Sequence, residues 1–182
     1  MSPRAHLVGP VPVGVDPDEY DRVRRRVLWK LTTGLYLVGS RAGERRNLMT
    51  CSLVTQLATE PKLVGVSIES GARTLELVHE GRAFVLALVS RVDRSVVRSF
   101  AKPAVDAPAA GTLNGRAYRP APVTGCPLPL LAAAYVDCRL ERAVDLGTHT
   151  LCVGEVVHAG FGDGGEDVPL LRTEDTRMSY GG

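Results

Sequence analysis

Short apolar segments separated by turn residues follow one another from Gly34 to Leu171, and this pattern limits the chain to a mainly β fold. Most of these segments are too short for helices, and they are rich in Val, Leu, Ile and Thr, which favours strands. Consecutive strands joined by tight turns pair antiparallel, and closure into a barrel removes exposed edges. We expect about six or seven strands, over residues 35–38, 48–57, 63–68, 83–89, 132–144 and 151–161, with 168–171 after a further turn.

A helix is expected before the strands, starting at the sequence Asp-Pro-Asp-Glu of residues 16–19. The first aspartate can cap the helix, the proline suits its first position, and the glutamate completes a capping box. Apolar residues then recur at helical spacing up to Leu31, and Trp29 follows them closely enough to pack in the core or in a dimer interface. The intervening arginines are expected to form a solvated face. Two shorter helices are expected over 72–79, ending at Gly81, and over 90–100.

The chain is expected to form an arm over residues 1–15, one domain over 16–172 and a polar tail over 173–182. Residues 102–125 are rich in Ala, Pro and Gly, and they are expected to form a long loop, which in a compact domain is usually functional or mobile. The tail either brings Arg177, Met178 and Tyr180 to a binding pocket or ends as a disordered segment, and we favour the second interpretation.

Composition excludes several classes of function. The net charge of +2 is too small to favour nucleic acid or an anionic membrane as the partner, and 5% aromatic residues do not suit a barrel that binds single strands. The sequence contains no apolar run of the roughly 20 residues that a membrane helix needs and no signal-peptide core, so we expect a cytoplasmic protein. The four cysteines and four histidines show no metal-ligand spacing, so no metal site is expected.

The segment that begins at Asn47 is unusually polar for a strand. It holds Asn47, Thr50, Ser52 and Thr55 close together, whereas a purely structural strand prefers β-branched and aromatic residues. Small hydroxyl and amide side chains allow a planar heterocycle to lie against the backbone and can bind its polar edge. A second interpretation of Asn47 is that it caps a turn after Gly43.

Residues 67–74 combine the end of a strand, a turn and the start of a helix. Helix starts present free N–H groups and the positive end of the helix dipole, which favour phosphate. Ser67, Ser70 and Thr74 add hydroxyl groups, and Arg73 adds a charged, forked donor. The segment therefore predicts a phosphate site, with an ordinary capped helix and a surface arginine as the alternative.

The order and spacing of several short motifs resemble those of the flavin reductase-like family, whose members have an FMN-binding split β-barrel. The motifs span about residues 30–172, and their order makes the resemblance more specific than any one of them. They are Arg46-Asn47-x-Met49-Thr50-x-Ser52, Glu60-Pro61-x-Leu63, Val66-Ser67-Ile68, Thr74-x-x-Leu77, Gly81-x-x-Phe84 and Gly147-Thr148-His149-Thr150 followed by Gly154-Glu155-Val156.

The resemblance implies a Greek-key split β-barrel with an N-terminal helix and two short inserted helices, and a homodimer with the flavin near the interface. His149 matches a histidine on the nicotinamide side of the pocket in reductase members, so it is the expected catalytic residue. The expected cofactor-binding residues are Asn47, Met49, Thr50, Cys51 and Ser52 along the ring and ribityl chain, Ser67, Arg73 and Thr74 around the phosphate, and Phe100 near the flavin.

The function that the resemblance implies is hydride transfer from NADH or NADPH to FMN, with FAD as the second candidate flavin. The reduced flavin would then supply a partner flavin-dependent monooxygenase. Residues 85–88 are apolar where the family often has an Asn-containing strand, so the alternative is an FMN-binding electron carrier or sensor without NAD(P)H oxidase activity. Cys51 has no neighbouring cation or cysteine in the sequence, so it is expected to be a small wall residue and not a redox thiol.

Overall fold

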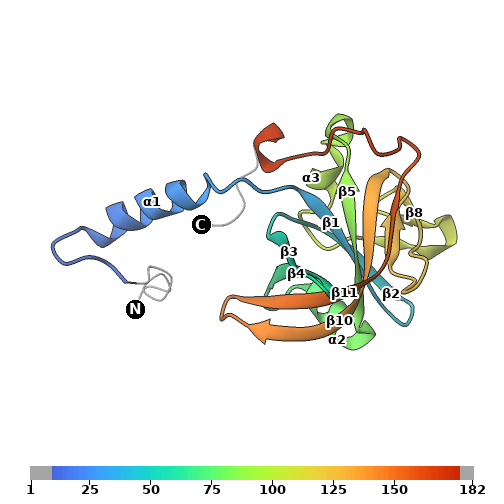
Figure 1. The fold of residues 1–182 in the computed structure, drawn as a ribbon, viewed down its shortest axis with the longest axis horizontal. Helices are drawn as coiled ribbons and strands as arrows, with labels where there is room; N and C mark the ends of the chain where they lie inside the picture. The colour runs from blue at the N-terminus through green and yellow to red at the C-terminus, as the bar shows by residue number, and fades with distance from the viewer. Residues whose placement is uncertain (1–9, 177–182) are drawn as a thin grey trace.

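The structure is a computed structural model that describes residues 10–176. Its main body is a seven-stranded antiparallel sheet in the order β2-β1-β5-β10-β11-β4-β3, which curls into a barrel (Figure 1). The expectation of a mainly β, antiparallel barrel is therefore confirmed. The strands are β1 (Tyr36–Ala42), β2 (Arg45–Cys51), β3 (Val54–Thr59), β4 (Lys62–Glu69), β5 (Ala83–Val89), β10 (Ala132–Asp145) and β11 (His149–Phe161).

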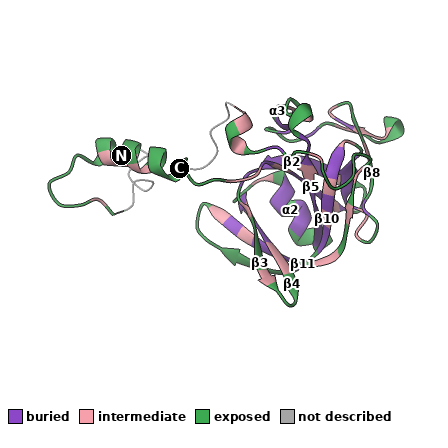
Figure 2. Cartoon of the chain, turned by 45° about the horizontal axis from the view of Figure 1, so that its top comes forward, coloured by how far each residue is buried: buried purple, intermediate pink, exposed green. Residues whose placement is uncertain are grey.

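Helix α1 (Pro17–Leu28) begins as predicted, because the Asp16 side chain accepts a hydrogen bond from the backbone N–H of Glu19. It projects away from the barrel (Figure 1) and has no buried residue (Figure 2). Trp29 is 47% exposed, so its interpretation as a core residue is wrong. The predicted apolar stripe exists, but the barrel does not cover it.

Two short helices, α2 (Arg73–Gly81) and α3 (Val96–Ser99), are inserted between strands as expected, but the single helix expected over 90–100 is divided into a 3-10 turn at residues 91–93 and the four-residue α3. The inner side of α2 is buried against the sheet (Figure 2). The helix ends at Gly81, but the left-handed residue that terminates it is Arg82, with φ of 54°. Gly81 serves a different purpose, since a Cβ atom there would lie 1.8 Å from the carbonyl oxygen of Arg41.

Strand β5 explains why two hydrophobic cores share one sheet. Val85 and Ala87 point into a core that includes α3, whereas Phe84 and Leu86 point into a second core that includes α2. Because successive side chains face opposite sides of a strand, a strand between two cores must be apolar throughout. The prediction of a buried strand here is confirmed.

Three predictions about the strands were wrong. Residues 102–125 are not a loop: with 127–129 they form a second, four-stranded sheet of β6 (Asp106–Ala107), β7 (Thr112–Leu113), β8 (Arg116–Pro120) and β9 (Pro127–Pro129). The expected strand 48–57 is divided into β2 and β3, and 168–171 forms only an isolated bridge. Strands of two to five residues containing Pro and Gly carry little local signal, so pairing with distant segments decides them.

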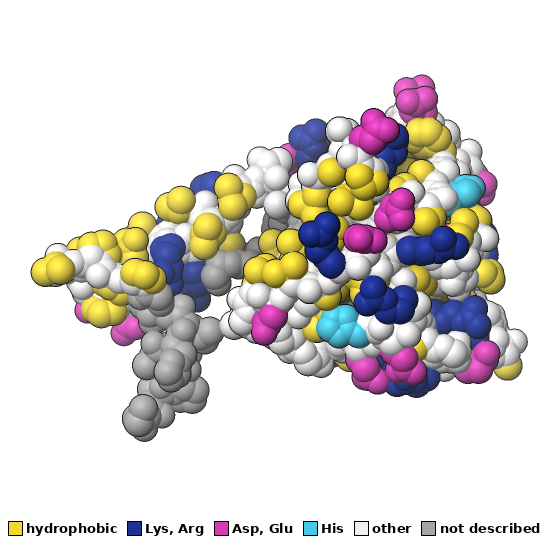
Figure 3. All heavy atoms as spheres, turned by 60° about the horizontal axis from the view of Figure 1, so that its bottom comes forward, with side chains coloured by type: hydrophobic (Ala, Val, Ile, Leu, Met, Phe, Trp, Pro, Cys, Tyr) yellow, Lys and Arg dark blue, Asp and Glu magenta, His cyan; other side chains and the backbone are white. Residues whose placement is uncertain are grey.

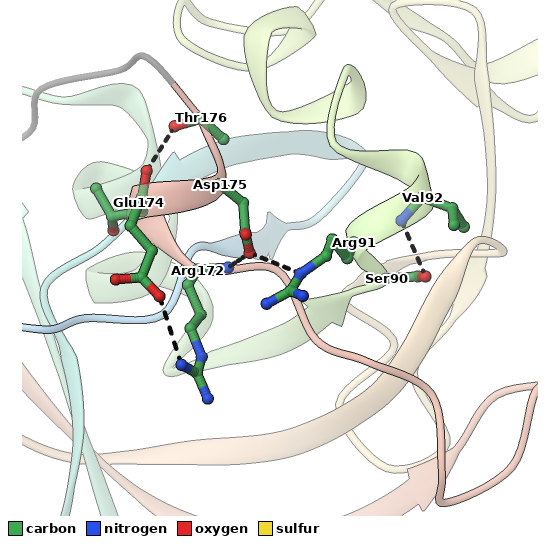
Figure 4. Close-up of polar contacts among 8 residues, drawn as sticks. Ser90, Arg91, Val92, Arg172, Glu174, Asp175 and Thr176 are labelled. Atoms are coloured by element: carbon green, nitrogen blue, oxygen red, sulfur yellow. Dashed lines mark hydrogen bonds and ion pairs between the residues drawn. The ribbon is translucent and has the colours of Figure 1, made fainter.

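The chain returns after β11 to the start of β1, where Thr173 hydrogen-bonds to Thr33. The short 3-10 turn η4 (Thr173–Asp175) is fastened there by Asp175, which accepts hydrogen bonds from the Arg172 backbone and the Arg91 side chain (Figure 4). The other 3-10 turns are η2 (Arg91–Asp93) and η3 (Pro108–Ala110).

The tail residues Arg177, Met178 and Tyr180 lie outside the described residues. Between residues 10 and 176, no helix is long and apolar enough to span a membrane.

Candidate functional site

One sheet face brings together two predicted site residues from distant parts of the sequence. Strand β11 pairs antiparallel with β4, with Leu151 opposite Ser67. Because side chains alternate between faces, Ser67, Leu151 and His149 share a face, while Val66 and Cys152 lie in the core behind it. Ser67 and His149 are both half-buried. The predicted phosphate segment and the predicted nicotinamide residue are therefore neighbours.

Two backbone turns hold this face together at one end. The Ser70 N–H donates to the Thr148 carbonyl oxygen at 2.9 Å, and the Ser70 hydroxyl donates to the Gly147 carbonyl oxygen at 3.0 Å. The hydroxyl of Thr148 lies 3.0 Å from Nδ1 of His149. The turn of the β10–β11 hairpin is thus attached to the turn between β4 and α2. The Ser70 hydroxyl donates its proton to the protein backbone, so it is not a free donor for a phosphate.

The start of α2 has no side-chain cap. Its N-cap residue is Ala72, which makes no capping hydrogen bond, and Gly71 before it has φ of +88°. The capped helix of the alternative interpretation is therefore wrong, whereas its surface arginine agrees with the structure. The first backbone N–H groups of a helix have no partner within the helix and attract anions. Arg73 is the first residue of α2 and is exposed, which adds a cation at the same point.

Asn47 and Thr74 contact each other inside the protein. The Asn47 amide donates to the Thr74 hydroxyl oxygen at 2.7 Å, and its carbonyl oxygen accepts from the Ala104 N–H at 2.8 Å. Both side chains are buried. Asn47 therefore links β2 to the start of α2 and to the segment after α3, and its interpretation as the cap of a turn after Gly43 is wrong. Its bond to Thr74 holds the start of α2 against β2.

The end of β2 is tied to α3. The Thr50 hydroxyl donates to the Val97 carbonyl oxygen, and the Thr50 N–H donates to the Phe100 carbonyl oxygen. Phe100 is fully buried in the core, and Met49 packs, half-buried, against the other core. Met49 and Thr50 thus lie within the segment where the sequence places the flavin ring, whereas Phe100, which was expected near the flavin, has no exposed surface. Ser52 follows them and is also buried.

Cys51 lies beneath Ser67, because its thiol donates to the Ser67 carbonyl oxygen at 3.6 Å. Burial raises the pKa of the Cys51 thiol to about 11. Since the thiolate is the reactive form of cysteine, this side chain is inert near neutral pH, in agreement with its interpretation as a wall residue. No group of three His, Cys, Asp or Glu side chains in residues 10–176 is arranged to hold a metal ion.

A cavity of about 400 Å³ lies where the linker after α1 meets the segment that follows β11. The sequence interpretation missed it, because its walls come from residues 32–36, 88–89 and 170–172. It does not include Ser67, Arg73 or His149. Its wall residue Tyr36 is opposite Cys51 in the β1–β2 pair, and burial, with a smaller effect of Cys51, raises the Tyr36 pKa. The cavity therefore adjoins the end of the predicted ring-binding segment.

Comparison with known proteins agrees with this architecture. Residues 28–180 match the family model described as flavin reductase like domain, so the chain belongs to the flavin reductase-like family. It is 30% identical over 160 residues to a high molecular weight rubredoxin of Moorella thermoacetica, covering 85% of this chain and 64% of that protein. The chain thus spans less than two thirds of this curated relative.

Solved structures of the family have the same fold. The Streptomyces globisporus C-1027 NADH:FAD oxidoreductase SgcE6, in complex with NAD and FAD fragments, is 25% identical, with a TM-score of 0.69 and coverage of 81% of this chain and 85% of that chain. BorF, the flavin reductase component of a bacterial two-component tryptophan halogenase, is 27% identical, with a TM-score of 0.68 and coverage of 78% and 88%.

Proposed function

We propose that this protein is an NAD(P)H-dependent flavin reductase that binds FMN between the start of α2 and the end of β2. The observation that carries the proposal is the uncapped start of α2, with Arg73 beside it, next to a face that bears Ser67 and His149. Membership of the flavin reductase-like family supports the same activity.

The residues present fit a flavin. The N–H groups of the α2 start and the Arg73 guanidinium suit a phosphate dianion, and Ser67 adds a hydroxyl on the adjoining face. Residues 50–52 would hold the ring, with Thr50 fixed from below by α3. When bound, the flavin supplies the redox chemistry by accepting a hydride from the nicotinamide.

The protein's own residues would then provide binding and orientation. His149 stands at the first position of β11, beside the flavin face, and would orient the nicotinamide. Asn47 and Thr74 hold α2 in place from inside the protein. FMN fits a site that ends at a single phosphate. FAD is the second candidate flavin, and the structure of SgcE6 in complex with NAD and FAD fragments supports it.

We further propose a homodimer with the flavin near its interface, and a partner oxygenase that consumes the reduced flavin. The face that bears Ser67 and His149 is partly exposed in the single chain, which suits a site completed by another subunit. BorF is a reductase component of a two-component halogenase, which supports a flavin-consuming partner here. A cytoplasmic location remains a prediction of the sequence.

The test is to measure flavin content by absorbance and then to add NADH or NADPH without oxygen. Loss of the oxidised-flavin absorbance at a rate that saturates with the nicotinamide concentration is expected. Bound flavin that neither nicotinamide bleaches would favour the electron carrier or sensor. A protein that binds no flavin would contradict both functions.

A further inference from the structure

Helix α1 exposes an apolar side that no described part of the chain covers. Val23 and Val27 lie about one turn apart on the helix, and Leu31 lies three residues after its end; their side chains are 46%, 62% and 68% exposed. Figure 3 shows hydrophobic side chains along this projecting helix. Apolar surface of this kind marks an interaction site. The match to the family model begins at residue 28, so most of α1 lies outside the region that the family shares.

The barrel has a partly exposed apolar face of its own, which we call the leucine face and in which Leu57 is exposed and Leu63 and Leu151 are half-buried. It consists of Leu57 on β3, Leu63 on β4 and Leu151 on β11. The side chains of Leu57 and Leu151 close over Gly65, where a Cβ atom would lie 2.9 Å from one and 3.1 Å from the other. Leu57 is 44% exposed. By strand alternation this face is opposite the core and continuous with Ser67 and His149.

The two surfaces match in size. A helix of 12 residues is about 18 Å long, and three adjacent strands span about 10 Å between their outer axes. The helix can therefore cross β3, β4 and β11 completely. A stable complex buries about 800 Å² on each partner. In a two-fold dimer the contact between helix and leucine face occurs twice, so each of the two contacts needs to bury only about half of that area on each subunit.

The charges around the two surfaces are complementary. Arg26 lies on α1 and Lys30 lies two residues after its end, whereas Glu69 and Glu155 lie at the borders of the leucine face on β4 and β11. All four side chains are exposed. None of them forms a salt bridge within residues 10–176. Opposite charges at the rim of an apolar contact set its orientation.

The point at which α1 leaves the barrel is fixed. Thr33 is hydrogen-bonded to Thr173 through both backbone and side chain, and the helix beyond it leads away from its own barrel (Figure 1). One chain thus carries an exposed helix side and a partly exposed sheet face that do not meet. Two copies related by a two-fold axis can cover both surfaces reciprocally.

We propose that α1 of each copy lies across the leucine face of a second copy, beside that copy's Ser67 and His149. The helix then forms part of the wall of the partner's binding site. This inference rests on the proposed homodimer and states how its two subunits contact each other, but it requires neither bound flavin nor activity. Its failure can therefore be distinguished from failure of the proposed function.

The first experiment measures molar mass by light scattering in the absence of flavin. Val27→Glu and Leu57→Glu should each weaken the dimer at least tenfold. Arg22→Gln, which changes the charge by the same amount on the far side of α1, should not, and neither should Gln56→Glu, next to Leu57 on the opposite face. Circular dichroism confirms that the variants are folded. A monomeric native chain, or a dimer that both Glu variants leave intact, would overturn the proposal.

A second experiment identifies which surfaces meet. The four native cysteines are buried, so cysteines introduced at the surface oxidise selectively. The double variant Val27→Cys with Leu57→Cys should give a covalent dimer, and neither single variant should. A disulfide within one chain would show that α1 folds onto its own barrel, and a covalent dimer of Val27→Cys alone would show that two helices pair. Either result, or no disulfide in the double variant, would overturn the proposal.

Discussion

At the scale of single residues, the candidate site divides into groups that face solvent and groups that hold the structure. Ser67, Arg73 and His149 are exposed or half-buried and surround the turn at the start of α2. Asn47 and Thr74 are buried and bond to each other. A substitution in the first group should change binding or rate, whereas one in the second group should first change the stability of α2.

Arg73→Ala should weaken FMN binding by about 1.5–3 kcal/mol, because a charge-assisted hydrogen bond to the phosphate is lost. This corresponds to a rise in Kd of roughly 10- to 150-fold. Quenching of flavin fluorescence on titration measures it. Arg94→Ala, another exposed arginine, is the matched control and should bind FMN normally. Equal affinities of the two variants would remove Arg73 from the site.

His149→Ala should slow flavin reduction by NADH and leave the Kd for FMN nearly unchanged, because His149 would orient the nicotinamide and not hold the flavin. Anaerobic stopped-flow absorbance gives the rate, and a separate titration gives the affinity. If flavin affinity falls together with the rate, the role of His149 is to support the turn that Ser70 fastens.

At the scale of elements, α2 is the part whose placement matters most for the site. Its start is positioned by Asn47, and its end packs against the backbone of β1 at Gly81. Exposed ion pairs from Arg45 to Glu76 and Glu80 also connect it to β2, but such pairs contribute little. The buried amide and the close backbone contact therefore hold the helix.

Gly81→Ala should destabilise the protein by about 1–3 kcal/mol. Helix propensity alone would favour alanine by about 1 kcal/mol, but the new Cβ would lie 1.8 Å from the backbone oxygen of Arg41, so the steric cost should exceed that gain. Urea unfolding measures the difference. Glu80→Ala, in the same turn, should change stability by less than about 0.5 kcal/mol. A more stable Gly81→Ala protein would show that β1 moves freely.

At the scale of the whole molecule, buried thiols are distributed across both cores. Burial raises the pKa of Cys51, Cys126 and Cys152 from 9.0 to about 11, and raises that of Cys138 further. The folded state therefore favours the protonated, neutral form of all four thiols. The stability that these thiols contribute is fully present below their pKa in the unfolded chain. It is lost as the pH rises through their pKa in the folded protein.

Stability should therefore fall between about pH 9 and pH 11, where the unfolded chain has released thiol protons that the folded chain retains. Each group contributes up to about 1.4 kcal/mol per pH unit in that range. The urea midpoint, measured from pH 7 to 11, follows this decline. The Cys51→Ala variant lacks one of these thiols, so its urea midpoint should decline less steeply with pH. A midpoint independent of pH would show that the thiols remain accessible to water in the folded protein.

Local sequence determined the elements with strong patterns. The capped start of α1, the fully apolar β5 and the hairpin between β10 and β11 follow from capping residues, alternation and turn residues within a few positions of each other. The weakly patterned strands β6–β9 could not be predicted, because two to five residues gain stability only from partners distant in the sequence. The break between β2 and β3 has the same cause, since pairing with different neighbours separates them.

The composition of the site was present in the sequence, but its arrangement was not. Ser67 and Arg73 could be assigned to one helix start because they are close in the chain. Their proximity to His149 depends on the register of β11 against β4, and the bond between Asn47 and Thr74 joins residues 27 positions apart. The solvent exposure of α1 is likewise a tertiary result. An apolar stripe fixes which side of a helix seeks a partner, and only the packed structure shows that its own barrel does not provide one.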